Sequence, residues 1–379
     1  MRSSSAGPST AGAATGSLRS SDAQPGPPLR HQVTELPRIA VTITEYRLHH
    51  LRCPQCGSVT RAAFPAEVPL GAFGPHLEAA VATLAVRNRV SRRDTVELVS
   101  ELFGARISAG SVDAILGRAG AALGLPYQEP LVHIRAAPAV NVDETGWRTQ
   151  GQKRTLWGAF TGRTAIFRIA PNRHEREAKA LLSESFAGIA CSDRWWAYNY
   201  LDPTRRQVCW AHLARDFTAH AEGLGAQKEF GEAALALAKR LFRAWDGYRT
   251  DGDRDCLLAQ MAPVKEELKA LLDTAAKKSP RNRRHRGLAK NLLKLWPALW
   301  TFASMPGVEP TNNHAERGLR GAVILRKLSL GTQSESGEHT IERLLSASVT
   351  CRLQKRSLFA YLSEVLAADV RGGPVPSLV

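Results

Sequence analysis

The stretch Ala139–Trp147, AVNVDETGW, decides how the rest of the chain is interpreted. Its valines alternate with polar residues, which predicts a strand that carries Asp143 on the face opposite the valines and turns at Gly146. A strand is a rigid mount for a metal-binding carboxylate, because hard cations need oxygen ligands in fixed geometry. The alternative is an acidic hairpin turn over residues 143–146.

The composition indicates a globular chain with a large excess of positive charge. The 379 residues are 44% hydrophobic and 23% charged, which is enough for two or three domains. Lys and Arg number 51 against 35 Asp and Glu, which leaves a net charge of +16. Such a surplus favours a polyanionic partner, because neutralising phosphates releases condensed counterions. Nucleic acid is therefore the predicted partner.

Targeting signals are not recognisable in this sequence. No apolar run approaches the roughly 18 to 20 residues of a membrane span, and the N-terminus lacks the apolar centre of a secretory signal. The six cysteines are scattered rather than arranged as a disulfide framework, so reduced thiols are expected. We expect a cytoplasmic protein without a membrane partner.

A possible metal-binding turn follows the run of residues 32–51, which alternates well enough to form one or two strands. The sequence CPQCG is half of a zinc knuckle, because its glycine permits the tight loop that directs Cys53 and Cys56 at one Zn²⁺ ion. A structural zinc site needs four ligands. His49, His50 or a partner chain would have to complete it.

The next segment is predicted to be helical. The run SRRDTVELVSELF begins with a serine N-cap and stops at Gly104, and a second amphipathic helix follows with Ser108 or Ser111 as its cap. Two helices joined by a short glycine-containing turn suggest a helix-turn-helix, with four arginines at its front: Arg87, Arg89, Arg92 and Arg93. A helical hairpin that serves only packing shows the same pattern, so both interpretations stay open.

The central segment is predicted to contain three strands, a helix and a fourth strand, GIACSD, that ends at Asp193. This order is that of a ribonuclease-H-like core. In that architecture the first strand carries a metal-binding acid, and the fourth strand ends beside it. Asp143 and Asp193 occupy these two places. Alternatively, Asp193 caps the helix suggested by RWWAYNYL.

A fifth strand then runs into a helix that carries Cys209 and His212. This pair is either half of a metal site or a buried thiol beside a hydrogen-bonded imidazole. Residues 224–305 contain only helical runs, separated by a basic segment without acids. A solvated loop is one interpretation of that segment. Phosphate contact is favoured, because charges of alternating sign are missing among Arg281, Arg283, Arg284 and Arg286.

The third acid is Glu316, in the stretch VEPTNNHAERGLRGAVILRK. Three capping residues precede it, namely Thr311, Asn312 and Asn313. They predict a helix with Glu316 in its first turn, although Asn313 and Glu316 are also spaced for a capping box. Four cations follow closely, a crowding that favours a bound anion: Arg317, Arg320, Arg326 and Lys327.

Together, the motifs VDETGWR, SDRWWAYN, CWAHLARDF and PTNNHAERGLR resemble those of the insertion-sequence-66 family of DDE transposases. YRLHHLRCPQCG and SRRDTVELVSELFGARIS match as well, so the resemblance covers roughly residues 30–365. It implies that Asp143, Asp193 and Glu316 form an acidic triad holding two Mg²⁺ (or Mn²⁺) ions. Other residues of these motifs are expected to shape the site: Cys209, His212, Asn312 and Asn313.

The resemblance implies metal-dependent cleavage and strand transfer at the ends of an insertion sequence. Water would release a 3′-hydroxyl at the element's end, and this hydroxyl would then attack target DNA. The implied partners are double-stranded DNA (terminal inverted repeats and target), further copies of the chain in a homo-oligomer, and accessory proteins of the element. The protein would act in the bacterial cytoplasm and associate with the nucleoid.

The N-terminal region departs from the family pattern. Full members usually carry a coiled-coil and DNA-binding region and a further cysteine pair upstream of Cys53, whereas this chain has a tail rich in Ser, Gly and Pro. We therefore expect a shortened copy. Two other functions remain open, a catalytically silent DNA-binding copy that acts as a repressor and a ribonuclease-H-like nuclease that cuts without joining.

The expected fold class is α/β, a ribonuclease-H-like core with a large all-α insertion, preceded by a zinc-knuckle-like segment and a helical region. The expected boundaries are 1–28 for a disordered tail, 29–70 for the zinc-knuckle-like segment, 71–130 for the helix-turn-helix-like region, 135–223 for the first part of the core, 224–305 for the helical insertion and 306–368 for the C-terminal helices with the catalytic glutamate.

Overall fold

The computed structural model describes residues 26–27, 30–37, 39–69, 71–278 and 284–379, and it divides into two compact units, Met1–Ala40 and Val41–Val379. Most of the predicted disordered tail lies outside the described residues. So do Arg281 and Arg283 of the predicted basic segment. The described part combines many helices with one mixed sheet, so the prediction of an α/β chain is confirmed.

A short hairpin carries the two neighbouring cysteines Cys53 and Cys56. Strand β1 (His50–Arg52) pairs antiparallel with β2 (Val59–Arg61). The prediction of one or two strands over residues 32–51 is wrong for most of that run, because only its last two residues belong to a strand. A strand needs a hydrogen-bonding neighbour, and β2 offers one to three residues only.

Helices follow the hairpin. They are α1 (Pro75–Ala82), a π-helical segment η1 (Thr83–Arg87), α2 (Arg92–Phe103) and α3 (Ala109–Ala122). The Ser91 hydroxyl accepts a hydrogen bond from the backbone N–H of Asp94 and caps α2, which ends at Gly104 with a φ of 67°. Ser108 caps α3 in the same way. These ends agree with the capping pattern of the sequence, because caps depend on neighbouring residues alone.

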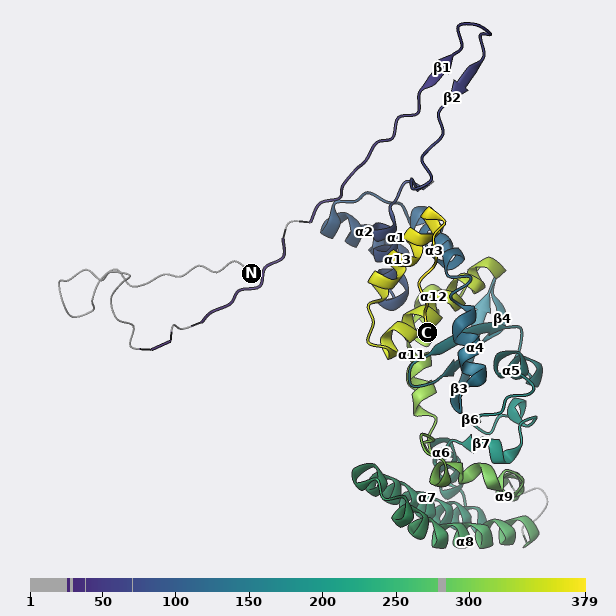
Figure 1. Cartoon of the computed structure of the whole chain (residues 1–379). Coiled ribbons are helices and arrows are strands. Elements are labelled where there is room, and N and C mark those ends of the chain that lie inside the picture. The colour runs from purple at the N-terminus through teal and green to yellow at the C-terminus, as the bar shows by residue number, and fades with distance from the viewer. Residues whose placement is uncertain (1–25, 28–29, 38, 70, 279–283) are drawn as a thin grey trace, which may run out of the picture. The chain divides into compact units, whose positions relative to one another are not determined.

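The sheet has five strands in the order β5-β4-β3-β6-β7 (Figure 1). Strands β3, β4 and β5 form an antiparallel meander, whereas β6 and β7 run parallel to β3. The central strand β3 therefore lies between the two halves. The strands are β3 (Ala139–Thr149), β4 (Gln152–Phe160), β5 (Ala165–Ala170), β6 (Ile189–Ser192) and β7 (Arg206–Val208).

The chain does not turn at Gly146, as the sequence had suggested. Gly146 pairs with Thr155 inside the β3–β4 ladder, and the turn falls at Gln150 and Gly151, whose φ angles are 51° and 75°. Two consecutive residues with positive φ match the right-handed twist of a two-residue hairpin. The acidic hairpin turn over residues 143–146 is excluded as well, because all four residues belong to β3.

Helices from distant parts of the chain cover the sheet. They are α4 (Gln128–Ala136), α5 (Glu175–Leu182), α11 (Asn313–Ser329) and α12 (Glu335–Leu353). The last helix, α13 (Leu358–Arg371), packs against α1, α3 and α12. Helix α12 lies along the edge strand β5. Three of its side chains accept backbone N–H groups of β5, at Ala165, Phe167 and Ile169. These bonds satisfy donors that an exposed sheet edge would leave open.

The chain between β7 and α11 is helical in its described part. It contains α6 (Trp210–Ala221), α7 (Ala226–Asp251), α8 (Arg254–Lys278), α9 (Arg284–Lys294) and α10 (Thr301–Ser304), with the short η4 (Trp296–Leu299). Helices α7 and α8 lie side by side (Figure 1), and the block shares one buried apolar cluster with β6 and β7. None of the described helices has the length and apolar character needed to cross a membrane.

Glu342 of α12 tests how much the edge contacts stabilise the sheet. Its carboxylate accepts the N–H of Ile169 at 2.5 Å and lies 3.0 Å from the His339 ring nitrogen. We expect Glu342→Leu to lower the free energy of unfolding by about 1–3 kcal/mol, the cost of a buried donor without a partner. Urea denaturation measures this change. Glu364→Leu on the exposed face of α13 is the control, and equal stability of the two variants would contradict the assignment.

Candidate active site

Asp143 lies in the middle of β3. The valines at 140 and 142 are buried, and Asp143 projects from the opposite face. Asp193 directly follows β6, and Asn141 pairs with Cys191 where β6 runs parallel to β3. Each acid therefore lies two residues beyond a paired position, which puts both at the same level of neighbouring strands. The sequence predicted this arrangement from strand order alone.

Glu316 reaches the same region because Asn312 joins α11 to β3. The Asn312 side chain is 1% exposed; its Nδ2 donates to the Val142 carbonyl at 2.8 Å, and its Oδ1 accepts from Asn141 at 2.9 Å. Its backbone N–H contacts the Cys209 sulfur at 3.1 Å. Glu316 lies in the first turn of α11. The anchored asparagine thus holds the start of the helix beside Asp143.

Neither structural alternative for the acids matches the observed geometry. Asn312 is the N-cap of α11 and makes no side-chain cap, so the capping box of Asn313 and Glu316 is wrong. Asn313 is instead the first residue of the helix. Asp193 is not a helix N-cap either, since Trp195 has that place before a short 3₁₀ segment. The Asp193 carboxylate does accept the Trp195 N–H at 2.8 Å, which fixes its orientation.

Two cationic or titratable side chains of α6 face Glu316. Arg215 Nη2 lies 3.3 Å from the carboxylate, and His212 Nε2 lies 3.8 Å from it. The Nδ1 atom of His212 is buried, and no described group bonds to it. Cys209 is buried, and burial raises the pKa of its thiol. Cys209 and His212 therefore border the acids as the motif suggested.

The electrostatics of the site centre on Asp143. Its pKa is raised to about 7, first by burial and then by the nearby negative charges of Glu144, Asp193 and Glu316. The backbone N–H of Glu144 donates to its carboxylate at 2.9 Å and offsets part of this effect. Four carboxyl groups thus share one region, where a cation would favour their charged forms.

Sequence reasoning missed a second layer around these acids. Arg173 forms ion pairs with Glu144 and, at 3.2 Å, with Asp193, and its guanidinium stacks over Trp195 at 4.2 Å. The Tyr198 hydroxyl donates to Glu144 at 2.5 Å. Only Tyr198 and Trp195 belong to a motif quoted from the sequence. Arg173 lies in a loop before α5, where nothing in its spacing signals a contact with β3.

The metal-binding predictions concern the three acids and the two hairpin cysteines. In the described part of the chain, no three or more His, Cys, Asp or Glu side chains are grouped closely enough to form a ready-made metal site. This applies to the three acids and to the hairpin cysteines. Cys56 lies beside the hydroxyl of Ser58, at 2.6 Å. Cys53 and Cys56 thus offer two sulfur atoms without a third described ligand.

The predicted DNA-contacting cations occupy different environments. Arg317, Arg320 and Lys327 are exposed on α11, and Arg284 is exposed at the start of α9. Two other arginines are engaged in the fold. Arg326 donates to the Thr145 hydroxyl and the Gly146 carbonyl of β3, and Arg286 donates to the Ala276 carbonyl at 3.0 Å.

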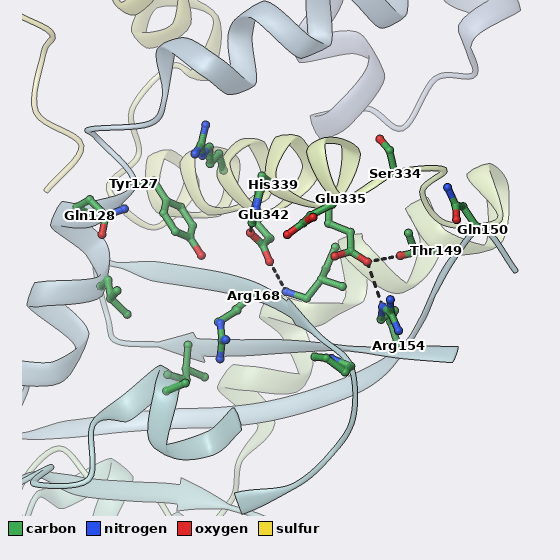
Figure 2. Close-up of a pocket in the computed structure, with 17 residues that line it drawn as sticks. Tyr127, Gln128, Thr149, Gln150, Arg154, Arg168, Ser334, Glu335, His339 and Glu342 are labelled. Atoms are coloured by element: carbon green, nitrogen blue, oxygen red, sulfur yellow. Dashed lines mark hydrogen bonds and ion pairs between the residues drawn. The ribbon is translucent and has the colours of Figure 1, made fainter. Parts of the chain in front are cut away.

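A cavity of about 750 Å³ lies elsewhere, between β5, α4 and α12 (Figure 2). None of the three acids lines it. Its charged groups are largely paired with each other or with the backbone. Glu338 contacts Thr149 and Arg154, and Arg168 pairs with Glu177. The cavity is therefore separate from the candidate site.

Comparison with known proteins identifies the class. The family model "Transposase IS66 family" matches residues 71–340, a range that includes all three acids. The chain is thus a member of a transposase family. Specifically, it belongs to the IS66 family.

Two curated relatives come from Sinorhizobium fredii (strain NBRC 101917 / NGR234), and both are named as uncharacterized proteins. The protein y4jD is 27% identical in a match that covers 65% of this chain and 53% of y4jD. The protein y4hP is 24% identical in a match that covers 90% of this chain and 68% of y4hP. The chain therefore spans between about half and two thirds of the length of these relatives.

The raised pKa of Asp143 predicts a pH-dependent stability. Because the folded chain binds this proton more tightly than the unfolded chain, stability present below about pH 4 is lost as the pH rises towards 7. At about 1.4 kcal/mol per pKa unit the loss is about 2–4 kcal/mol. Asp143→Asn should therefore be more stable than the wild type at pH 8 without metal. Urea denaturation at pH 5 and 8 measures this, with the exposed Asp246→Asn as control. An unchanged pH profile in Asp143→Asn would contradict the assignment.

Arg173 is expected to stabilise the buried carboxylate of Glu144, whose side chain is 1% exposed. Arg173→Met should lower the free energy of unfolding at pH 7 by about 2–3 kcal/mol, because it leaves a buried charge without its ion pair. Adding Glu144→Gln should restore at least half of that loss. Chemical denaturation of the single and double variants measures both effects. Arg163→Met, at an exposed position, should change little; absence of any recovery in the double variant would refute the pairing.

Proposed function

We propose that this chain is a DNA transposase that cleaves and joins DNA strands at the ends of an insertion sequence. Asp143, Asp193 and Glu316 are the proposed metal-binding catalytic acids. One observation carries the proposal: two acids at the same level of parallel neighbouring strands, and a third on a helix that Asn312 ties to the same strand. Family membership supports the transposase class.

The strand order supports a ribonuclease-H-like core. Three antiparallel strands are followed by two strands parallel to the first, and the first strand lies at the centre. In this interpretation the helices α6 to α10 are an insertion between β7 and α11. The insertion would leave the acids in place, because α11 returns to β3 through Asn312.

The acids fit a divalent cation by their chemistry. Carboxylate oxygens are the ligands that Mg²⁺ and Mn²⁺ prefer, and a cation would relieve the repulsion that three neighbouring carboxyl groups exert on Asp143. When bound, two such ions would activate the attacking oxygen and stabilise charge on the leaving oxygen. Glu144 is a weaker candidate ligand, since Arg173 and Tyr198 already bind its oxygens.

The remaining residues have supporting roles in this proposal. Asn312 and Cys209 fix the start of α11, and Arg173 holds Asp193 through one carboxylate oxygen. His212 and Arg215 face Glu316 and orient its carboxylate. The exposed cations would bind phosphates that flank the reacting bond: Arg317, Arg320 and Lys327 on α11 and Arg284 on α9.

The partners and the whole-protein activity are also proposals. We propose double-stranded DNA as partner, comprising terminal repeats and target, with several copies of the chain in the active complex and accessory proteins of the element. The net charge of +16 supports a polyanionic partner. Zinc binding by Cys53 and Cys56 would require ligands from a partner chain.

Cleavage and joining of labelled DNA test the function. A duplex carrying the element's terminal repeat is incubated with the full chain and Mg²⁺ or Mn²⁺. We expect the wild type to cut and join, and Asp143→Asn and Glu316→Gln to bind the duplex but lose at least 10³-fold in rate, on the order of one strong transition-state interaction. Asp246→Asn is the matched control.

Two outcomes would overturn parts of this proposal. Cleavage without joining would favour a nuclease. A wild type that binds DNA but is as inert as both variants would favour the silent DNA-binding copy, which occupies element ends as a repressor.

A further inference from the structure

An irregular connection between α1 and α2 carries two arginines in an unusual backbone. Helix α1 widens into the π-helical η1, which ends at Arg87, and Arg89 follows with a φ of 62°. A bulky residue rarely adopts this left-handed conformation, and its cost is on the order of 1 kcal/mol or more. π-Helical turns and strained residues are concentrated at functional sites. Part of this conformation is a helix end, because the Val90 N–H donates to the Leu84 carbonyl at 3.0 Å across the left-handed Arg89. Glycine usually occupies that position, so an arginine there calls for a reason.

Three guanidinium groups converge at this connection. Arg89 Nη1 donates to the Arg87 carbonyl at 2.9 Å, and η1 packs against α12, whose last turn carries Arg352. The pKa of Arg352 is lowered by partial burial and then by the positive charges of Arg87 and Arg89. No carboxylate in the described part of the chain forms an ion pair with any of the three. Such mutual repulsion is unfavourable unless an anion lies among them.

The same group borders α11. A Cβ atom on Gly321 would lie 3.6 Å from Arg89 Nη1, so Arg89 reaches over this glycine. Arg317 is exposed one turn earlier on the same helix, and the exposed Arg320 directly precedes Gly321. Gly321 lies five residues beyond Glu316 on α11, a rise of about 7.5 Å at 1.5 Å per residue. Cations thus continue from the candidate acids along α11 to Arg89 and its neighbours.

Helix-end electrostatics explain only part of this arrangement. Arg87 and Arg352 stand in the last turns of η1 and α12, where a cation is favourable beside unpaired carbonyl groups. That effect accounts for each of these two residues separately. It explains neither the choice of an arginine at the left-handed position 89 nor the approach of three like charges.

We propose that Arg87, Arg89 and Arg352 bind the sugar-phosphate backbone of double-stranded DNA, at a site separate from the acids. This rests on the proposed function. The duplex that flanks the reacting phosphate runs along the first half of α11 and is held beside Gly321 by these arginines. They contact phosphates and no base edges, so they contribute affinity and register without sequence preference.

The test is a salt titration of DNA binding by the full chain, followed by fluorescence anisotropy of a labelled 30-base-pair duplex, a length of about 100 Å. The test variant combines Arg87→Gln, Arg89→Asn and Arg352→Gln, because asparagine tolerates the left-handed backbone. The control combines Lys239→Gln, Arg243→Gln and Arg249→Gln. These replace three exposed cations of α7 and so remove the same amount of positive charge as the test variant. Thermal melting checks that each variant is folded.

We expect the slope of log K against log salt concentration to fall by about 2–3 in the test variant, since each phosphate contact contributes about 0.9. The control should change the slope by less than half as much. If the test variant does not fold, Arg352→Gln alone, at an exposed side chain, should lower the slope by about 0.9. Replacement of all three by lysine should retain most of the slope.

Three results would overturn the inference. In the first, the wild type binds DNA and the folded test variant keeps the wild-type slope. The arginine site is then refuted and the proposed function stands. If the triple variant does not fold, the same result for Arg352→Gln alone has the same meaning. A decrease in slope equal to that of the control would also refute the site, because the decrease would then reflect the net charge of the protein alone. A wild type that does not bind DNA would refute both proposals.

Discussion

The hydrogen bonds of Asn312 are the constraint on which the candidate site depends. This buried side chain joins β3 to α11, although most of the sheet and the whole helical block lie between these two elements in the sequence. Its backbone also contacts Cys209 at the start of α6. A buried amide is costly unless its donors and acceptor find partners, so the three elements meet in one arrangement only. The position of Glu316, in the first turn of α11, follows from that arrangement.

The buried negative charges in this region destabilise the fold, and the positive charge of Arg173 offsets part of this effect. Burial and neighbouring carboxylates raise the pKa of Asp143 to about 7, while Arg173 and Tyr198 bind the adjacent Glu144. One carboxylate of the pair in β3 is thereby neutralised by the protein. In the proposed function the other carboxylate, that of Asp143, is available to a metal ion. Two acids that are adjacent in sequence thus have separate roles, set by the faces and partners that the strand gives them.

Sequence patterns predicted the structural features that depend only on neighbouring residues. The alternation of valines in β3, the Ser91 cap and the Gly104 stop follow from short-range geometry, and the strand order put Asp143 and Asp193 side by side. Contacts between distant segments could not be predicted in this way. The pairing of Arg173 with Glu144 and the anchoring by Asn312 each depend on a partner far along the chain.

The central claim is that Asp143, Asp193 and Glu316 together bind the divalent metal used on DNA. Anomalous scattering from crystals of the full chain grown with Mn²⁺ and a DNA duplex tests it most directly. The account predicts manganese bound to carboxylate oxygens of all three acids, next to a backbone phosphate. Manganese bound elsewhere, or bound without Asp143 and Asp193, would contradict it.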